Sequence, residues 1–344
     1  MAYINFQPRD FFNTVLYTGN GTTQSITGVG FQPDWTWIKE RSSTSNHEVY
    51  DSTRGATKLL SPNNTDAEGT NASALTSFDS DGFSVGSGGA VNENSQTYVG
   101  WNWKADGGTT SSNSDGSITS TVQANTTAGF SIVTYTGNGT SGATVGHGLG
   151  KAPATVIIKS RDDADSWLVL PPSLGATKAL NLDTTGQVQT YTPYFNDTNP
   201  TSTVFSLGND GRTNGSSENF VAYCFADVKG YSKFGSYTGN GNANGPFIYT
   251  GFRPAFVIAK VTNATNSWTI QDNKRNVDNP VSNYLLANDS GAEGTSGLDF
   301  DFLSNGFKLR TASGAVNGSG NTHIYMAFAE FPLVGSNGLA GTAR

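Results

Sequence analysis

The chain has 344 residues, of which 20 are basic and 27 acidic, giving a formal net charge of −7. Only 14% of residues are charged, and Lys and Arg form no cluster, so we expect no nucleic acid among the partners, because phosphate binding needs grouped cations. The single cysteine, Cys224, excludes an intrachain disulfide, and neither a signal peptide nor a membrane-inserted segment is predicted.

Short aromatic and β-branched runs recur along the whole chain, bounded by Gly, Asn, Asp and Pro. Such runs are typical of β-strands, and no window of eleven or more residues shows helical apolar spacing. Four dipeptides that favour turns separate some of the runs: Asp81-Gly82, Asn214-Gly215, Asn305-Gly306 and Asn317-Gly318. The sequence therefore predicts an all-β protein.

Four landmarks occur three times, in one order and at nearly fixed offsets. Each copy opens with Tyr-Thr-Gly-Asn-Gly, starting at Tyr17, Tyr135 and Tyr237. A strand-like run from a proline to a lysine follows: Pro33–Lys39, Pro153–Lys159 and Pro254–Lys260. An aromatic with an aliphatic two places on comes next, at Phe83, Phe205 and Phe307. The last landmark is Tyr98–Trp101, Phe220–Tyr223 and Tyr325–Phe328. The pattern predicts three copies of one folding unit.

We predict that each copy is a β-sandwich of the jelly-roll, lectin-like kind. The predicted organisation is an N-terminal arm (1–10), repeat one (11–106), a Gly-, Ser-, Thr- and Asn-rich linker (107–129), repeat two (130–229), repeat three (230–333) and a C-terminal tail (334–344). We expect the linker to lie extended across a neighbouring unit.

Catalytic chemistry is not indicated by any residue pattern. Acidic residues sit in turn-like segments, and no Asp/Glu pair recurs in all three copies, as a duplicated glycosidase site would require. His47, His147 and His323 follow no nucleophile elbow. Asp79 and Asp81 begin a calcium-loop-like phrase that lacks the remaining ligands, and no His or Cys pair has zinc spacing. We therefore expect a non-enzymatic protein without cofactor or metal.

Six tryptophans raise the question of sugar stacking. Trp35, Trp37, Trp101 and Trp103 lie in predicted strands and are expected in hydrophobic cores. Trp167 and Trp268 lie at matching offsets in their copies, where repeat one has Glu48, and a core position is expected there too. Polar loops rich in Asn, Thr and Gly are compatible with carbohydrate binding, but the sequence identifies no ligand-binding residue.

Four segments carry a resemblance that spans nearly the whole chain: Tyr17–Gly21, Gly30–Lys39, Tyr231–Gly241 and Gly251–Val257. They resemble a family of virion-associated proteins from marine tailed bacteriophages, described as tail-fibre-like or lectin-like. The resemblance implies a virion component assembled in the host cytoplasm. It carries no catalytic residue.

Two roles on a phage particle remain open at this point. The first is host attachment of the tail-fibre or adhesin type, with other virion proteins and a host-surface glycan as partners. The alternative is a capsid decoration or head-fibre protein that reinforces the shell, and polysaccharide depolymerisation is a distant third. Three copies could mimic a trimer within one chain, or three chains could form a homotrimer.

Overall fold

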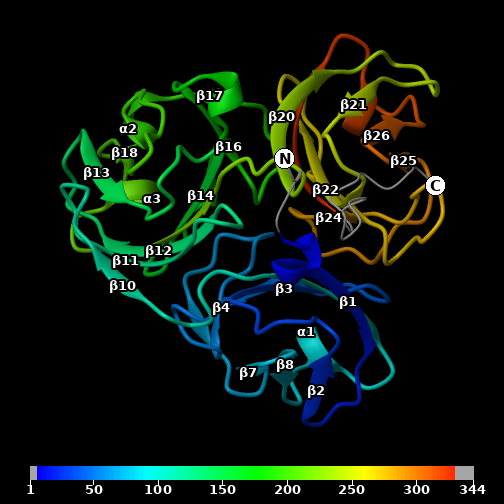
Figure 1. Cartoon of the computed structure of the whole chain (residues 1–344), viewed down its shortest axis with the longest axis horizontal. Coiled ribbons are helices and arrows are strands. Elements are labelled where there is room, and N and C mark those ends of the chain that lie inside the picture. The colour runs from blue at the N-terminus through cyan, green and yellow to red at the C-terminus, as the bar shows by residue number, and fades with distance from the viewer. Residues whose placement is uncertain (1–5, 330–344) are drawn as a thin grey trace.

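The computed structural model of the chain describes residues 6–329. The ladders that define its sheets are antiparallel, and the helices in this range span only three or four residues. The predicted all-β class is confirmed. Figure 1 shows three lobes grouped around a common centre, which we call lobe 1 (residues 6–110), lobe 2 (residues 111–229) and lobe 3 (residues 230–329).

The elements of lobe 1 are η1 (Pro8–Asp10), β1 (Phe12–Thr18), β2 (Gln24–Thr27), β3 (Trp35–Glu40), β4 (Glu48–Asp51), β5 (Lys58–Leu59), β6 (Gly69–Thr70), β7 (Leu75–Asp79), β8 (Gly82–Val85), α1 (Gly89–Asn92) and β9 (Thr97–Trp103). They form a larger sheet in the order β1-β9-β3-β4, a smaller sheet β2-β8-β7, and the pair β5-β6.

The elements of lobe 2 are β10 (Ser111–Asn113), β11 (Ser120–Asn125), β12 (Phe130–Thr136), β13 (Ala143–Gly146), β14 (Thr155–Ser160), β15 (Leu168–Leu170), η2 (Pro172–Leu174), β16 (Lys178–Asn181), β17 (Gln189–Thr190), α2 (Thr192–Phe195), β18 (Val204–Leu207), α3 (Gly211–Asn214) and β19 (Asn219–Phe225). The larger sheet runs β10-β11-β12-β19-β14-β15-β16-β17, and the smaller sheet is β13-β18.

The elements of lobe 3 are β20 (Ser232–Thr238), β21 (Phe247–Tyr249), β22 (Pro254–Val261), β23 (Thr269–Asp272), β24 (Leu285–Leu286), β25 (Phe300–Leu303), β26 (Gly306–Leu309), α4 (Gly314–Asn317) and β27 (Thr322–Ala329). The larger sheet is β20-β27-β22-β23-β24 and the smaller is β21-β26-β25.

One ladder register is common to the three larger sheets. Lys39 pairs with Val99, Lys159 with Val221 and Lys260 with Ile324. We call residues of two lobes matching when they occupy the same position relative to these pairs. In the smaller sheets the reference pairs are Ile26 with Phe83, Val145 with Phe205 and Ile248 with Phe307. The register corrects one landmark: His323, not Tyr325, matches Tyr98 and Phe220, because His323 pairs with Tyr237 as they pair with Tyr17 and Tyr135.

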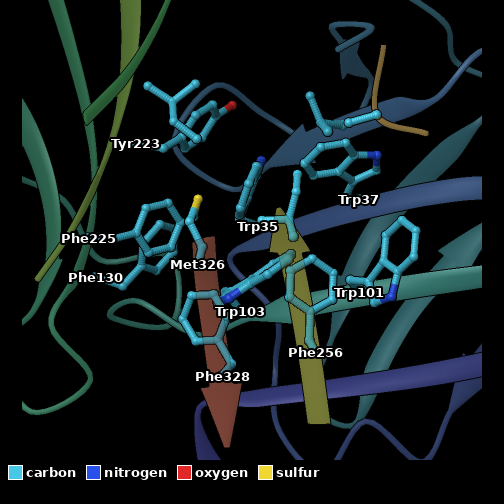
Figure 2. Packing of buried hydrophobic residues seen from close by; sticks show 14 of the residues in the cluster. Trp35, Trp37, Trp101, Trp103, Phe130, Tyr223, Phe225, Phe256, Met326 and Phe328 are labelled. Atoms are coloured by element: carbon cyan, nitrogen blue, oxygen red, sulfur yellow. The ribbon is translucent and has the colours of Figure 1, made fainter. Parts of the chain in front are cut away.

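Each lobe has an apolar layer between its two sheets, and the inner faces of the larger sheets form a fourth cluster shared by all three lobes. Aromatic rings dominate this central cluster (Figure 2). Trp35 of lobe 1 stacks on Tyr223 of lobe 2, with ring centroids 4.6 Å apart. Trp103 of lobe 1 meets Phe328 of lobe 3 edge-on at 5.5 Å. The lobes therefore bury apolar surface against one another, which stabilises their mutual arrangement.

Equivalent hydrogen bonds close the three lobes into a ring. In each, a buried ring nitrogen reaches a backbone carbonyl of the next lobe: Trp167 Nε1 to Ser61 at 2.9 Å, Trp268 Nε1 to Asn181 at 2.9 Å, and His47 Nε2 to Leu286 at 3.0 Å. His47 Nδ1 accepts a hydrogen bond from Trp37 Nε1. The proton of the neutral imidazole therefore lies on Nε2, which donates to the Leu286 carbonyl. Contacts of one kind that run head to tail and return to their start define a closed ring of rotationally related units.

The repeated Tyr-Thr-Gly-Asn-Gly phrase forms the end of one strand and the loop that follows it. Its first glycine has no room for a side chain: a Cβ on Gly19 would lie 2.2 Å from the Glu93 carbonyl oxygen. Its second glycine, Gly21, has a φ of 70°, a conformation that favours glycine. The matching glycines of the other copies share these two constraints. The phrase is thus a structural marker.

A buried asparagine holds each of these loops. Asn92 Oδ1 accepts from the Asn20 backbone N–H at 2.9 Å, and its amide nitrogen donates to the carbonyls of Thr22 and Gly86. Asn214 and Asn317 make the same contacts in lobes 2 and 3. Both were predicted as turn residues, but they end the short helices α3 and α4 and are fully buried.

The predicted linker at 107–129 is wrong in its central part. Ser120–Asn125 forms β11, which pairs with β12, and Ser111–Asn113 forms β10 beside it. Ile118 and Val122 are buried, so the segment contributes apolar side chains to lobe 2. Polar composition concealed these strands because β11 alternates small polar residues with a few apolar ones.

The two predicted terminal segments are only partly described. Residues 6–10 of the N-terminal arm belong to the packed structure, since Phe6 meets Phe11 at 5.0 Å and Tyr231 at 5.7 Å between ring centroids. The predicted C-terminal tail, 334–344, lies outside the described residues.

Candidate functional site

The three histidines have structural surroundings. His47 is fully buried between Trp37 and the Leu286 carbonyl, and burial lowers its pKa to about 3. His147 accepts from the Leu149 N–H, and burial lowers its pKa as well. His323 stacks on Tyr237 at 4.9 Å, and its pKa falls to about 4, again chiefly through burial. All three imidazoles are neutral near pH 7, and each is buried, His47 at the boundary between lobes 1 and 3.

The acidic residues of the turn-like segments bind neighbouring backbone and hydroxyl groups. Asp81 accepts from the N–H groups of Gly28 and Gly30, and Asp79 accepts from Ser77 and Ser84. Within residues 6–329, no group of three His, Cys, Asp or Glu side chains lies close enough to hold a metal ion. In the same range, no helix has the length and apolar character needed to cross a bilayer.

All six tryptophans are buried, so the core positions predicted for them are confirmed. Trp167 and Trp268 match His47, not Glu48, because Glu48 pairs with Ile38 as Leu168 pairs with Ile158. The one-residue difference arises from loop lengths that vary between the copies. None of these indoles presents a face to solvent.

Three buried lysines are the second-last residues of the matching strands β3, β14 and β22. Lys39, Lys159 and Lys260 have no exposed surface, and each donates to the backbone carbonyl of the residue that follows it. Burial lowers each pKa to about 8. Because the three lobes share this arrangement, we interpret it as part of the fold.

An exposed aromatic pair distinguishes lobe 3 from the other lobes. Phe247 and Tyr249 on β21 are 44% and 64% exposed, and they alternate with buried Ile248, so both project from the outer face of the smaller sheet. Figure 1 places β21 at the periphery of lobe 3. The fold does not require these rings, because the matching residues are Ser25 and Thr27 in lobe 1 and Thr144 and Gly146 in lobe 2.

Polar groups lie next to the pair on the same sheet. Lys308 is opposite Phe247, and Asp301 is opposite Lys308 on the next strand. Asp301 pairs with Arg310 at 3.3 Å. Tyr249 lies opposite Gly306, and the Phe247 ring covers this glycine, because a Cβ on Gly306 would lie 2.8 Å from Phe247 Cζ. Exposed rings flanked by charged and hydrogen-bonding groups can contact a ligand that has both an apolar face and polar groups.

Sequence reasoning missed Phe247 and Tyr249 because the short run Phe247–Tyr249 reads as one more buried strand. An alignment of the three copies could have revealed them, because at these two positions lobe 3 has aromatic residues and the other two lobes have Ser, Thr or Gly.

The protein thus belongs to the all-β class and consists of three lobes that close around a common core. The family model of a domain of unknown function, DUF7483, matches residues 7–332, and the chain belongs to this family. Neither a curated protein nor a solved structure matched the chain.

Proposed function

We propose that this protein is a non-enzymatic structural protein of a tailed-bacteriophage particle and that it attaches the particle to a host-surface glycan, as tail-fibre adhesins do. Its three lobes are, in this proposal, copies of one lectin-like β-sandwich unit. The sequence resemblance to virion-associated proteins supports the setting. The observation that carries the binding role is the exposed pair Phe247 and Tyr249, present in one lobe only.

The distribution of differences among the lobes supports this division of roles. Positions that the copies share are occupied by the central aromatic cluster, the buried lysines and the asparagine-held loops. These side chains are buried in the folded protein and cannot contact a large ligand. The outer faces of the smaller sheets differ, and a receptor could reach them without disturbing the ring.

A double variant that restores the residues of lobe 1 tests the attachment role. F247S/Y249T removes both rings, and we expect binding to purified host-surface polysaccharide to weaken at least about tenfold, a loss of about 1.4 kcal/mol. V277S is the matched control, because it removes another apolar side chain of lobe 3 that is 74% exposed. Biolayer interferometry measures the affinities. The attachment role would be refuted if the double variant bound the polysaccharide with wild-type affinity, or if the wild-type protein did not bind it.

Capsid decoration is the second candidate, and the closed three-lobed ring favours it. A ring of three related units matches a site of local threefold symmetry on an icosahedral shell. Quantitative gel analysis of purified particles separates the two roles. Decoration requires a copy number that scales with the capsomers, whereas an adhesin is present in a few copies.

The non-enzymatic part of the proposal has a separate test. Incubation with host polysaccharide should leave its size distribution unchanged in gel filtration. Progressive shortening would instead support depolymerisation.

A further inference from the structure

The residue that closes the ring between lobes 3 and 1 is a histidine, whereas the matching residues at the other two interfaces are tryptophans. His47, Trp167 and Trp268 each reach a backbone carbonyl of the neighbouring lobe through a ring nitrogen, at 3.0, 2.9 and 2.9 Å. An indole does not titrate in water, but a solvated imidazole takes up a second proton with an ordinary pKa of about 6.5. One of the three interfaces therefore depends on a residue whose charge changes with pH.

A second exchange within lobe 1 accommodates this histidine. Its neighbour on β3 is Trp37, where the matching residues of the other lobes are Ile157 and Ile258. All three belong to the central cluster, and the Trp37 and His47 rings meet nearly edge-on with centroids 5.7 Å apart. Lobe 1 thus has a Trp-and-His pair in the place of an Ile-and-Trp pair.

Both ring nitrogens of His47 make bonds that need the neutral imidazole. Nδ1 accepts from Trp37 Nε1 at 2.8 Å, and Nε2 donates to the Leu286 carbonyl of lobe 3. Protonation places a hydrogen on Nδ1, so that two N–H donors face each other and Trp37 Nε1 loses its acceptor. His47 has no exposed surface, so solvent cannot replace that acceptor while the interface is closed.

The charged groups around His47 oppose an imidazolium. Burial, together with the positive charges of Lys39 on β3 and Arg275 of lobe 3, lowers the pKa of His47 to about 3. The backbone groups of Leu286 and Asp289 act in the opposite direction but do not compensate. The Asp289 carboxylate attracts Lys39.

The carboxylates nearest to the ring in sequence or across the interface have other partners. Glu48, the next residue, points to the other face of its strand and accepts from Tyr50. On the lobe 3 side, Asp272 pairs with Arg275, and Glu293 bridges Arg275 and an arginine of lobe 1. Neither nitrogen of His47 is bound to a carboxylate that would stabilise its charged form.

We infer that the lobe 3–lobe 1 interface is an acid-sensitive joint of the ring and that His47 is its sensor. Acid favours an open form in which lobes 1 and 3 separate at this interface, because solvent then reaches the imidazole and solvates its charge. The inference is independent of the attachment role, because it involves no residue of the Phe247 and Tyr249 face.

The pH range of the joint follows from the two forms of His47. The imidazole of the open form binds a proton below about pH 6.5, whereas the closed form binds one only near pH 3. Closure is therefore fully stable above about pH 6.5, and the equilibrium constant for opening rises about tenfold for each pH unit below it.

Thiol labelling with dithiodipyridine can measure the opening of one interface. Ala287 follows Leu286 in the chain and is fully buried, so the cysteine of A287C reacts when the lobe 3–lobe 1 interface opens. S61C places a cysteine at the residue whose carbonyl Trp167 reaches between lobes 1 and 2. The native Cys224, fully buried in β19, reports unfolding of the whole chain. Peptide mass spectrometry separates the cysteines, and each rate is divided by that of the urea-unfolded chain at the same pH.

We expect the labelling of A287C to accelerate about 100-fold between pH 7.5 and 4.5, since the lower value lies about two units below the ordinary pKa of histidine. At pH 4.5 it should be faster than the labelling of Cys224 in the same chain and of S61C. Equal rates for A287C and Cys224 would overturn the joint, because the interface would then open only when the whole chain unfolds. Equal acceleration of S61C and A287C would contradict a sensor at one interface.

A double exchange removes the sensor and keeps the packing. W37I/H47W gives lobe 1 the residue pair of lobes 2 and 3, and A287C in this background should lose the 100-fold acceleration. H47Q decides if the double variant does not fold, because glutamine keeps a donor for the Leu286 carbonyl and does not titrate. The full acceleration in either folded variant would overturn the role of His47.

H323F is the matched control for the loss of a buried histidine. His323 lies within lobe 3, and the matching residue of lobe 2 is Phe220. We expect the acceleration of A287C to be the same with and without this substitution, because His323 makes no hydrogen bond across the interface.

Discussion

Asn92, Asn214 and Asn317 each join a loop, a strand end and a short helix through one buried amide. Asn92 lies in a helix of four residues, too short to be stable alone, so its side-chain bonds replace the support that a longer helix would have. The carbonyls of Thr22 and Gly86 and the N–H of Asn20 depend on it.

We predict that N92A lowers the free energy of unfolding by about 3 kcal/mol, because buried backbone groups lose their partners. Chemical denaturation followed by tryptophan fluorescence measures the change. N94A, at an exposed neighbouring position, should leave the stability unaltered within about 0.5 kcal/mol. A loss in N92A no larger than in N94A would contradict the structural role of the amide.

The three buried lysines predict an unusual dependence of stability on pH. Each has a pKa of about 8 in the folded chain, below the ordinary 10.5. Between these values the unfolded chain binds more protons than the folded one, so the free energy of unfolding contributed by the lysines rises with pH. Below about pH 8 the folded chain bears the full cost of holding them charged.

K260M should remove one of the three contributions. We expect its free energy of unfolding to rise less steeply than that of the wild type between pH 8 and 10, by up to about 1.4 kcal/mol per pH unit. Urea denaturation at a series of pH values gives both slopes. Parallel slopes would show that Lys260 titrates normally.

At the scale of elements, the contacts between lobes differ more than the lobes do. At the interface of lobes 1 and 2, Glu68 binds Arg161 at 2.8 Å and the fully buried Arg54 at 3.1 Å. Glu293 joins Arg41 and Arg275 in the same way at the interface of lobes 3 and 1. The backbone N–H groups of Glu68 and Glu293 also donate to the carbonyls of Arg161 and Arg41. The same backbone bond between lobes 2 and 3 runs from Val188 to Thr262, two residues without charge, and the ion pair that links these lobes, Lys233 with Asp227, lies elsewhere.

This difference predicts a non-additive pair of substitutions. E68V alone leaves two arginines without that partner and should cost about 3–5 kcal/mol. R161T/E68V places at this interface the residues of the lobe 2–lobe 3 interface. We expect the double variant to be less destabilised than the sum of the single variants, as measured in a double-mutant cycle. Strict additivity would mean that the two side chains do not interact.

Strand positions with aromatic and β-branched residues could be predicted from the sequence, as could the repeat of Lys39, Lys159 and Lys260. Strand β11 could not, since small polar residues dominate its segment and only its pairing with β12 reveals it. The burial of Asn214 and Asn317 was also unpredictable, because Asn-Gly is equally typical of an exposed turn.

At the scale of the molecule, one chain builds three lobes that close around a common core. The central cluster takes residues from all three lobes, so no lobe has a complete core by itself. The exposed pair could not be singled out without this arrangement. Phe247 stands out only in comparison with the matching residues Ser25 and Thr144.

The shared core predicts one cooperative unfolding transition for the whole chain. Far-ultraviolet circular dichroism reports on the strands of all three lobes, whereas tryptophan fluorescence reports mainly on lobe 1, which holds four of the six tryptophans. The two denaturation curves should coincide if the lobes unfold together. Separate midpoints would indicate that a lobe unfolds independently of the ring.

An electron cryomicroscopy map of the assembled particle tests the proposed attachment role most directly. The proposal predicts the three-lobed ring on the tail, with the Phe247 and Tyr249 face of lobe 3 directed outward. Density for the ring distributed over the capsid, with that face against the shell, would contradict it.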